Sequence, residues 1–183
     1  MELIIFLVVL VLLGLGILLL YNSLATGRLQ VREAWSTVGV QLQRRASLIP
    51  NLVETVKGYA SHERKTFDRV SRARAMLQSA GSPGEAAQAN AMLTQALRSL
   101  FAVAEAYPEL KANQNFLDLQ EQLKDTEDKI AYARTYYNAR VLQYNTRVAT
   151  LPSALIARLF GFREEEFFEA PEAAQQEVRV SFS

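Results

Sequence analysis

The pattern of apolar and polar positions divides the chain into an apolar N-terminal segment and a long amphipathic remainder. Residues 3–20 carry no charged or polar side chain, and Tyr21 follows them. As a helix this segment is about 27 Å long, close to the thickness of the hydrocarbon core of a bilayer. A helix that is apolar on every face belongs in lipid, and a tyrosine favours the headgroup boundary. We therefore predict a membrane anchor over residues 1–24, with residues 3–21 in contact with the lipid bilayer.

A cleaved signal peptide is the alternative explanation of this segment. Ser-Leu-Ala at residues 23–25 is an acceptable cleavage site, but the apolar run is longer than that of a usual signal peptide and no basic residue precedes it. The first basic residues, Arg28 and Arg32, follow the apolar run. Because positively charged flanks stay in the cytoplasm, we expect an N-terminus that faces outward and a cytoplasmic body.

Beyond the anchor, apolar residues recur at the three- and four-residue spacing of amphipathic helices. A first stripe covers residues 31–60 and weakens into a polar and basic helix through residue 75. Pro50 interrupts this stripe, and we expect a kink there rather than a helix end. Ser82, Pro83 and Glu85 form the start signal of a second helix, because a serine cap, a proline at the first position and a capping-box glutamate occur in order. That helix should end before Tyr107-Pro108.

The longest helix is predicted from near Phe116 to a stop before Pro152. A short amphipathic helix over residues 152–160 should close at Gly161. These elements predict an all-α fold: one N-terminal transmembrane helix followed by an elongated antiparallel bundle of three long helices and a short fourth helix. We expect the bundle to occupy residues 25–162 and the acidic C-terminal tail, residues 163–183, to be ordered only in part.

Composition narrows the classes of function. The 183 residues have a net charge of +1 and include no cysteine, which excludes disulfides and a thiol nucleophile. Ten basic residues stand against four acidic ones between residues 21 and 81, and two against six after residue 161. This gradient suits a basic stretch beside anionic lipid, although ordinary solvated helix faces explain it equally well. No basic cluster is interleaved with aromatic residues, so nucleic acid is not an expected partner.

No motif in the sequence indicates a catalytic, cofactor-binding or metal site. His62 is the only histidine, so neither a zinc site nor a serine–histidine–aspartate set can be assembled around it. The chain also lacks a glycine-rich phosphate loop. We therefore expect a protein that is not an enzyme and that needs no cofactor.

Polar residues within or beside the apolar stripes are the remaining candidates. A buried arginine needs a carboxylate, which Glu105 or Glu127 can supply to Arg45. We expect most of these residues to satisfy backbone groups freed at the proline breaks and to fix helix register, and fewer to contact a partner. The structural or partner-binding candidates are Arg44, Arg45, Pro50, Asn51, Glu105, Tyr107, Pro108, Tyr137, Asn138 and Asn145.

Short stretches along nearly the whole chain resemble the LemA family of bacterial membrane proteins. They include Leu42-Gln43-Arg44-Arg45, Leu48-Ile49-Pro50-Asn51, Val56-Lys57-Gly58-Tyr59-Ala60, Ala104-Glu105-Ala106-Tyr107-Pro108, Tyr136-Tyr137-Asn138, Tyr144-Asn145 and Phe160-Gly161-Phe162. The resemblance implies a single-pass protein of the bacterial inner membrane, with its N-terminus outside and a cytoplasmic helical bundle. It implies no established enzymatic activity. Family members look like companions of membrane-bound proteases, and relatives take part in shaping magnetosome membranes.

The leading hypothesis is a non-enzymatic, membrane-anchored scaffold or adaptor that forms a homo-oligomer or binds another membrane protein, for example a membrane protease. Confinement to a membrane strengthens weak lateral contacts, and the tyrosine-rich stripe of the longest helix is the expected self-association surface. The alternative is a monomer that buries this stripe in its own core. Two alternatives belong to other functional classes. One is a small-ligand sensor, and the other is a hydrolase or transferase that uses Arg45, Glu105 and Asn138. An exposed apolar patch favours the scaffold, and a concave polar pocket favours the other two.

Overall fold

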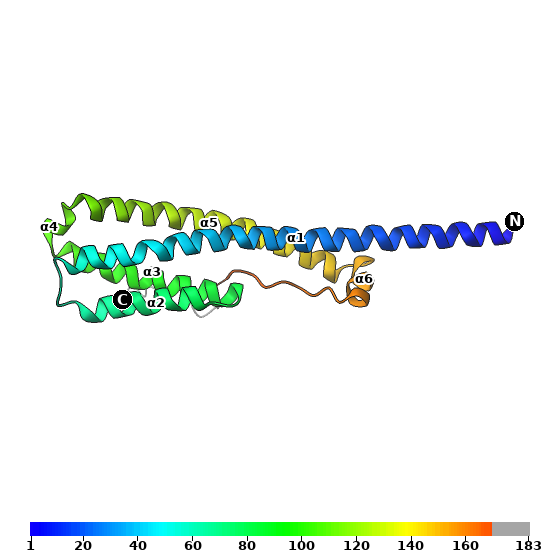
Figure 1. Ribbon diagram of the computed structural model, residues 1–183. Coiled ribbons are helices and arrows are strands. Elements are labelled where there is room, and N and C mark those ends of the chain that lie inside the picture. Colours follow the sequence, from blue (N-terminus) through cyan, green and yellow to red (C-terminus); the bar gives the residue numbers. More distant parts are fainter. Residues whose placement is uncertain (170–183) are drawn as a thin grey trace, which may run out of the picture. The chain divides into compact units, whose positions relative to one another are not determined.

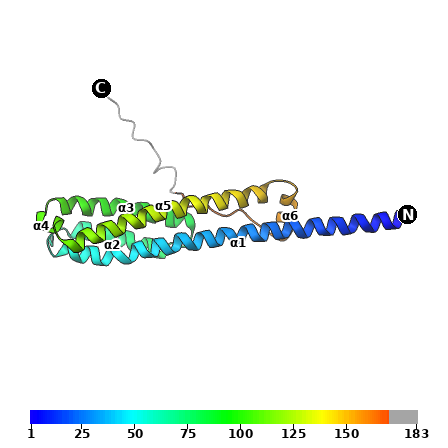
Figure 2. The same ribbon diagram turned by 90° about the horizontal axis from the view of Figure 1, so that it is seen from above.

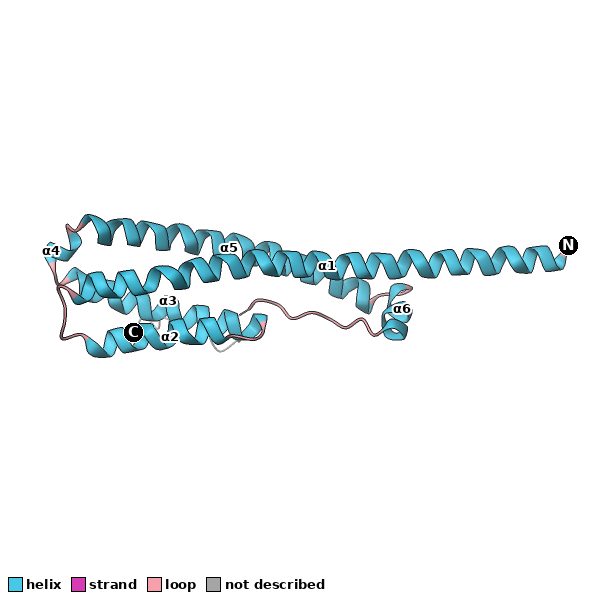
Figure 3. Cartoon of the chain, in the orientation of Figure 1, coloured by secondary structure: helices cyan, strands magenta, loops and turns pink. Residues whose placement is uncertain are grey.

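The computed structural model describes residues 1–169, and within them it contains six α-helices and no strand (Figures 1 and 3). The helices are α1 (Glu2–Lys57), α2 (Arg64–Ser79), α3 (Pro83–Glu105), α4 (Pro108–Lys111), α5 (Gln114–Ala149) and α6 (Ser153–Phe160). The predicted all-α fold is confirmed. Most of the tail, residues 170–183, lies outside the described residues, so the expectation about its order stays a prediction.

The predicted helix ends are found where local sequence signals mark them. The Ser82 hydroxyl accepts a hydrogen bond from the Glu85 backbone N–H (3.3 Å), and the Glu85 carboxylate accepts one from the Gly81 N–H (2.7 Å). This is the expected capping box at the start of α3. Gly161 closes α6 with a left-handed φ of 73°, a conformation that glycine adopts without strain.

The helix of the first amphipathic region is continuous with the anchor and ends earlier than predicted. It begins in the apolar anchor and continues without a break through Pro50, but it ends at Lys57. Residues 58–63 form turns, and the stretch expected as a polar continuation is a separate helix, α2. The turn lets α2 fold back and pack on α3, which buries Phe67, Val70, Ala73 and Leu77. Its apolar side was obscured in the sequence by the basic residues between these positions.

The chain divides into two compact units, which α1 and α5 both enter. We call Met1–Ser36 with Thr135–Glu166 the anchor unit, and Thr37–Arg134 with the residues from Phe167 the bundle unit. In the bundle unit, α1, α2, α3 and α5 run in alternating directions (Figures 1 and 2). Its core includes Val38, Leu42, Ile49, Val56, Val70, Leu93, Leu97, Leu100, Phe116, Leu123 and Ile130.

The anchor unit packs the middle of α1 against the end of α5, and α6 completes it. Its buried side chains are Leu24, Val31, Ala34, Tyr137, Val141, Tyr144, Ala154, Ile156 and Ala157. The two long helices approach closely at Gly27, where an added Cβ would lie 3.3 Å from the Tyr144 ring. Arg147 then donates to the Ser23 carbonyl across the same contact (3.2 Å). A larger residue at position 27 would therefore require the Tyr144 ring to shift by a few tenths of an ångström.

Most of the apolar stripe on α5 is used inside the protein. Phe116, Leu123, Ile130, Ala133, Tyr137, Val141 and Tyr144 are buried, and Leu119 and Val148 are half-buried. The stripe is therefore not available as the self-association surface that the sequence suggested. The outer side of α5 instead exposes Tyr132 and Leu142.

The apolar segment at the start of α1, residues 3–20, is exposed except at Gly16 and Leu20, which are half-buried. Within residues 1–169, α1 is the one helix long and apolar enough to cross a membrane, and none of its most apolar 18-residue window is buried. The core helix of a soluble protein would bury this surface, so the segment remains a candidate membrane span.

Candidate functional site

The bundle unit contains a buried cluster of polar side chains around Arg45. This arginine lies on α1 and is only 2% exposed. Its guanidinium donates from Nη1 to Asn90 Oδ1 (2.7 Å) and from Nη2 to Thr94 Oγ1 (3.0 Å), both on α3. The Glu127 carboxylate on α5 lies 3.9 Å from Nη2. One arginine thus joins three helices of the bundle unit.

The electrostatics of this cluster follow from its burial. Desolvation lowers the pKa of Arg45, and the negative charge of Glu127 raises it in partial compensation. Glu105 and Glu127 were the two counterions expected from the sequence, and the structure pairs Arg45 with Glu127. Glu105 is exposed and lines a different hollow, beside Phe101 and Phe116. Arg45 and Glu105 therefore do not line one cleft.

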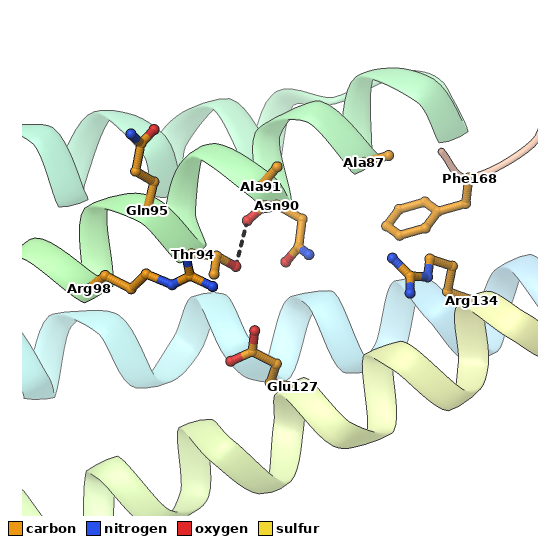
Figure 4. Close-up of a pocket in the computed structure, with 9 residues that line it drawn as sticks. All are labelled: Ala87, Asn90, Ala91, Thr94, Gln95, Arg98, Glu127, Arg134 and Phe168. Carbon is orange, nitrogen blue, oxygen red and sulfur yellow. Dashed lines mark hydrogen bonds between the residues drawn. The ribbon is translucent and has the colours of Figure 1, made fainter. Parts of the chain in front are cut away.

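An open cleft of about 410 Å³ adjoins the cluster between α3 and α5 (Figure 4). Asn90, Thr94 and Arg98 reach it from α3, and Glu127 and Arg134 reach it from α5. The buried Phe168 ring lies at one end of the cleft. Its charged lining can attract a polar or anionic molecule. Asn90, Thr94 and Glu127 are already engaged by Arg45, which leaves the two other arginines as the side chains best placed to bind a ligand.

Pro50 leaves one backbone carbonyl of α1 without its helical hydrogen bond, and an arginine on α2 replaces that bond. Proline has no N–H, so the carbonyl of Ala46, four residues earlier, loses its helical partner. Arg74 on α2 donates from Nε to this carbonyl at 2.9 Å. A residue outside the candidate set, Arg74, thus satisfies the backbone carbonyl that this proline leaves free.

In the anchor unit, polar residues of α5 and α1 hold the segment that follows α6. The side-chain amide of Asn145 donates to the Glu165 carbonyl and accepts from the Glu165 N–H, each at 2.9 Å. The Tyr137 hydroxyl donates to the Glu166 carbonyl (2.6 Å), and Arg28 binds the Glu165 carboxylate (2.8 Å). These contacts hold in place a segment that is itself neither helix nor strand.

The Tyr137 hydroxyl is kept protonated by its surroundings. Burial raises the pKa of Tyr137 to about 12, and the nearby Glu165 and Glu166 carboxylates act in the same direction. Burial also raises the pKa of Tyr144, against the opposing effect of Arg28. The Trp35 and Tyr137 rings lie 5.3 Å apart, so this tyrosine packs in the core while its hydroxyl holds the extended segment.

The remaining candidates lie at helix surfaces and ends. Arg44 is partly exposed and lies 3.6 Å from Asp125, and Asn51 is exposed. Tyr107 and Pro108 begin α4, and Asn138 is half-buried in the anchor unit. Among residues 1–169, no three histidine or acidic side chains come together as metal ligands would. Five further residues with polar contacts were not among the candidates, because their roles depend on contacts distant in sequence: Arg28, Arg74, Asn90, Thr94 and Glu165.

The paired arginines provide a direct test of this geometry. Arg45→Ala leaves Asn90 and Thr94 without their buried donor, so we expect it to lower the free energy of unfolding by about 3 kcal/mol. Arg44→Ala removes an exposed ion pair and should cost less than about 1 kcal/mol. Urea unfolding of the full-length variants in mild detergent measures both values. An equal cost for the two substitutions would contradict the buried cluster.

The raised pKa of Tyr137 predicts a pH dependence. The unfolded tyrosine loses its proton near pH 10 and the folded one near 12. The protonated hydroxyl therefore stabilises the fold fully below pH 10, and this contribution is lost as the pH rises from 10 through 12. Tyr137→Phe should be less stable by about 1 kcal/mol at neutral pH, and the difference from wild type should narrow above pH 10. A difference that stays constant from pH 7 to 12 in urea unfolding would refute it.

Comparison with known proteins places this architecture in a family. The model of the LemA family matches residues 34–182. Magnetosome protein MamQ 2 of Paramagnetospirillum magneticum is 26% identical over 188 residues, covering 88% of this chain and 69% of the relative. Protein LemA of Metamycoplasma hominis is 23% identical over 164 residues, covering 87% and 74%. These names state no enzymatic reaction, and with the apolar helix they fit a membrane-associated protein. Because the family match covers well over half of its length, this chain belongs to the LemA family.

Proposed function

We propose that this protein is a non-enzymatic, membrane-anchored scaffold that forms a homo-oligomer or binds another membrane protein, such as a membrane protease. The observation that carries the proposal is the continuity of α1. Its residues 3–20 carry only apolar side chains, most of them exposed, and its later part contributes to the cores of both units. A helix built in this way holds a folded domain at a membrane surface, and the outer faces of that domain stay free for protein contacts.

The apolar segment serves as a retained anchor rather than a signal peptide in this proposal. Cleavage at residues 23–25 would cut α1 in the middle of a continuous helix. It would also remove or expose Leu24, which is fully buried in the anchor unit. The loss of a buried leucine from a small core is costly, so retention of the segment agrees with the packing.

The orientation follows from charge. No basic residue precedes the apolar run, whereas Arg28, Arg32 and Arg147 all belong to the anchor unit beyond it. Basic flanks stay in the cytoplasm, so we place the N-terminus outside and the helical units in the cytoplasm, with the span in the bacterial inner membrane.

Exposed leucines on the anchor unit are the proposed self-association contacts. Leu29 on α1 is 63% exposed and Leu142 on α5 is 60% exposed. Each lies two residues from the close contact of Gly27 with Tyr144, so both lie at one level of the antiparallel pair and point outward on its opposite sides. Exposed apolar side chains gain most when a second surface covers them.

The polar cleft beside Arg45 supports a second candidate, a small-ligand sensor, less strongly. Three of its polar side chains already bind Arg45 or one another, so a ligand would depend mainly on Arg98 and Arg134. The scaffold needs no such ligand and accounts for the anchor as well.

Light scattering of the full-length protein in mild detergent at micromolar concentration tests the scaffold. We expect wild type to form a defined oligomer and Leu142→Lys to shift the mass toward the monomer, because a charge on this face is costly to bury. Gln143→Lys, a neighbouring exposed substitution with the same charge change, is the matched control and should retain the wild-type mass.

Affinity purification from native membranes tests whether the protein binds a different membrane protein. Recovery of wild type with a second membrane protein, and loss of that protein with Leu142→Lys but not with Gln143→Lys, would support the adaptor. A strictly monomeric wild type recovered alone from membranes would refute both forms of the proposal.

A further inference from the structure

The short helix α6 is apolar on two opposite sides. Ala154, Ile156 and Ala157 are buried against the anchor unit. On the other side, Leu155 and Leu159 are 61% and 73% exposed. Residues four apart share one helix face, so these two leucines form one outer surface, and Leu151, 74% exposed, precedes it in the chain. Packing within the anchor unit explains the inner side of α6 but not the outer one.

Aromatic contacts place this outer surface at the end of the apolar span. The ring of Tyr21, the residue that ends the span, lies 5.0 Å from the Phe160 ring and 5.6 Å from the Phe162 ring. Both views show α6 beside α1 within the anchor unit (Figures 1 and 2). The rotation and level of α6 are therefore fixed relative to the point where α1 leaves the apolar segment.

We propose that α6 is an interfacial helix whose outer surface, Leu155 and Leu159, inserts into the cytoplasmic face of the lipid bilayer. The inference rests on the membrane anchoring proposed above. Amphipathic helices bury their apolar side at the boundary of headgroups and acyl chains, and they carry basic residues beside it. Arg158 and Arg163 are exposed at this end of the unit and can reach lipid phosphates.

The lipid surface is the occupant that the geometry favours over a second protein. The exposed leucines belong to the helix whose Phe160 ring packs against Tyr21 at the end of the apolar segment, so a bilayer that covers residues 3–20 would lie close to them. A single spanning helix leaves the attached unit free to rotate about the helix axis and to tilt. A second contact at α6 removes this freedom and presents the same faces of the anchor unit to neighbouring molecules in every copy.

Lipid quenching of single fluorescent labels tests this contact. The chain contains no cysteine, so each introduced cysteine gives one labelled site in the full-length protein. We would label Leu155→Cys and Leu159→Cys with bimane and reconstitute the protein into phosphatidylcholine–phosphatidylglycerol vesicles with brominated acyl chains. Leu10→Cys in the span and Leu29→Cys, an exposed leucine about 12 Å beyond Tyr21 along α1, are the controls.

We expect quenching at both α6 positions, strongest when the bromine atoms lie close to the headgroups. Leu10→Cys should be quenched most by bromine atoms deep in the acyl chains, and Leu29→Cys should show no bromine-dependent loss. Quenching at Leu10→Cys without quenching at either α6 position would overturn the interfacial helix and leave the anchor intact. A blue-shifted but unquenched signal at α6 would mean that protein covers this surface, which also overturns the proposal. No quenching at Leu10→Cys would overturn the proposed anchoring itself.

Discussion

One helix has to meet two different environments, and the rest of the structure depends on how α1 does so. Over residues 3–20 every side chain is exposed or nearly so and apolar, as lipid requires. From Leu24 onward the same helix buries only one stripe, as a protein core requires. Because no loop separates the two parts, the packing of Leu24, Gly27 and Val31 ties the anchor unit directly to the end of the apolar segment.

Inside the bundle unit, two arginines link helices by polar contacts beside this apolar stripe. Arg45 links α1 to α3 and approaches Glu127 on α5, and Arg74 links α2 to the α1 carbonyl that Pro50 leaves free. Buried polar groups are costly unless they are paired, so these contacts specify which helices are neighbours and in what register. They also explain why paired arginines and a mid-helix proline stand within an otherwise apolar pattern without any catalytic role being required.

Local signals in the sequence were sufficient for much of the fold. Ser82, Pro83 and Glu85 marked a helix start, and Pro152 with Gly161 bounded the last two helices, because caps and prolines act on their own neighbours in the chain. The separation of α2 was missed, since its apolar side becomes apparent only when α3 is present to cover it. Glu127 was named as a possible partner of Arg45, but Asn90, Thr94 and Glu165 were missed, because they are 20 to 49 residues from the side chains they bind and only the packed helices bring them together.

The continuity of α1 between lipid and protein core is the central claim, and hydrogen exchange of the full-length protein in a lipid bilayer tests it most directly. Helical amides that are shielded from water exchange slowly. The account predicts slow exchange from the apolar segment through Leu24 and Val31, with no rapidly exchanging segment around residues 21–26. Rapid exchange across residues 21–26, or throughout residues 3–20, would contradict it.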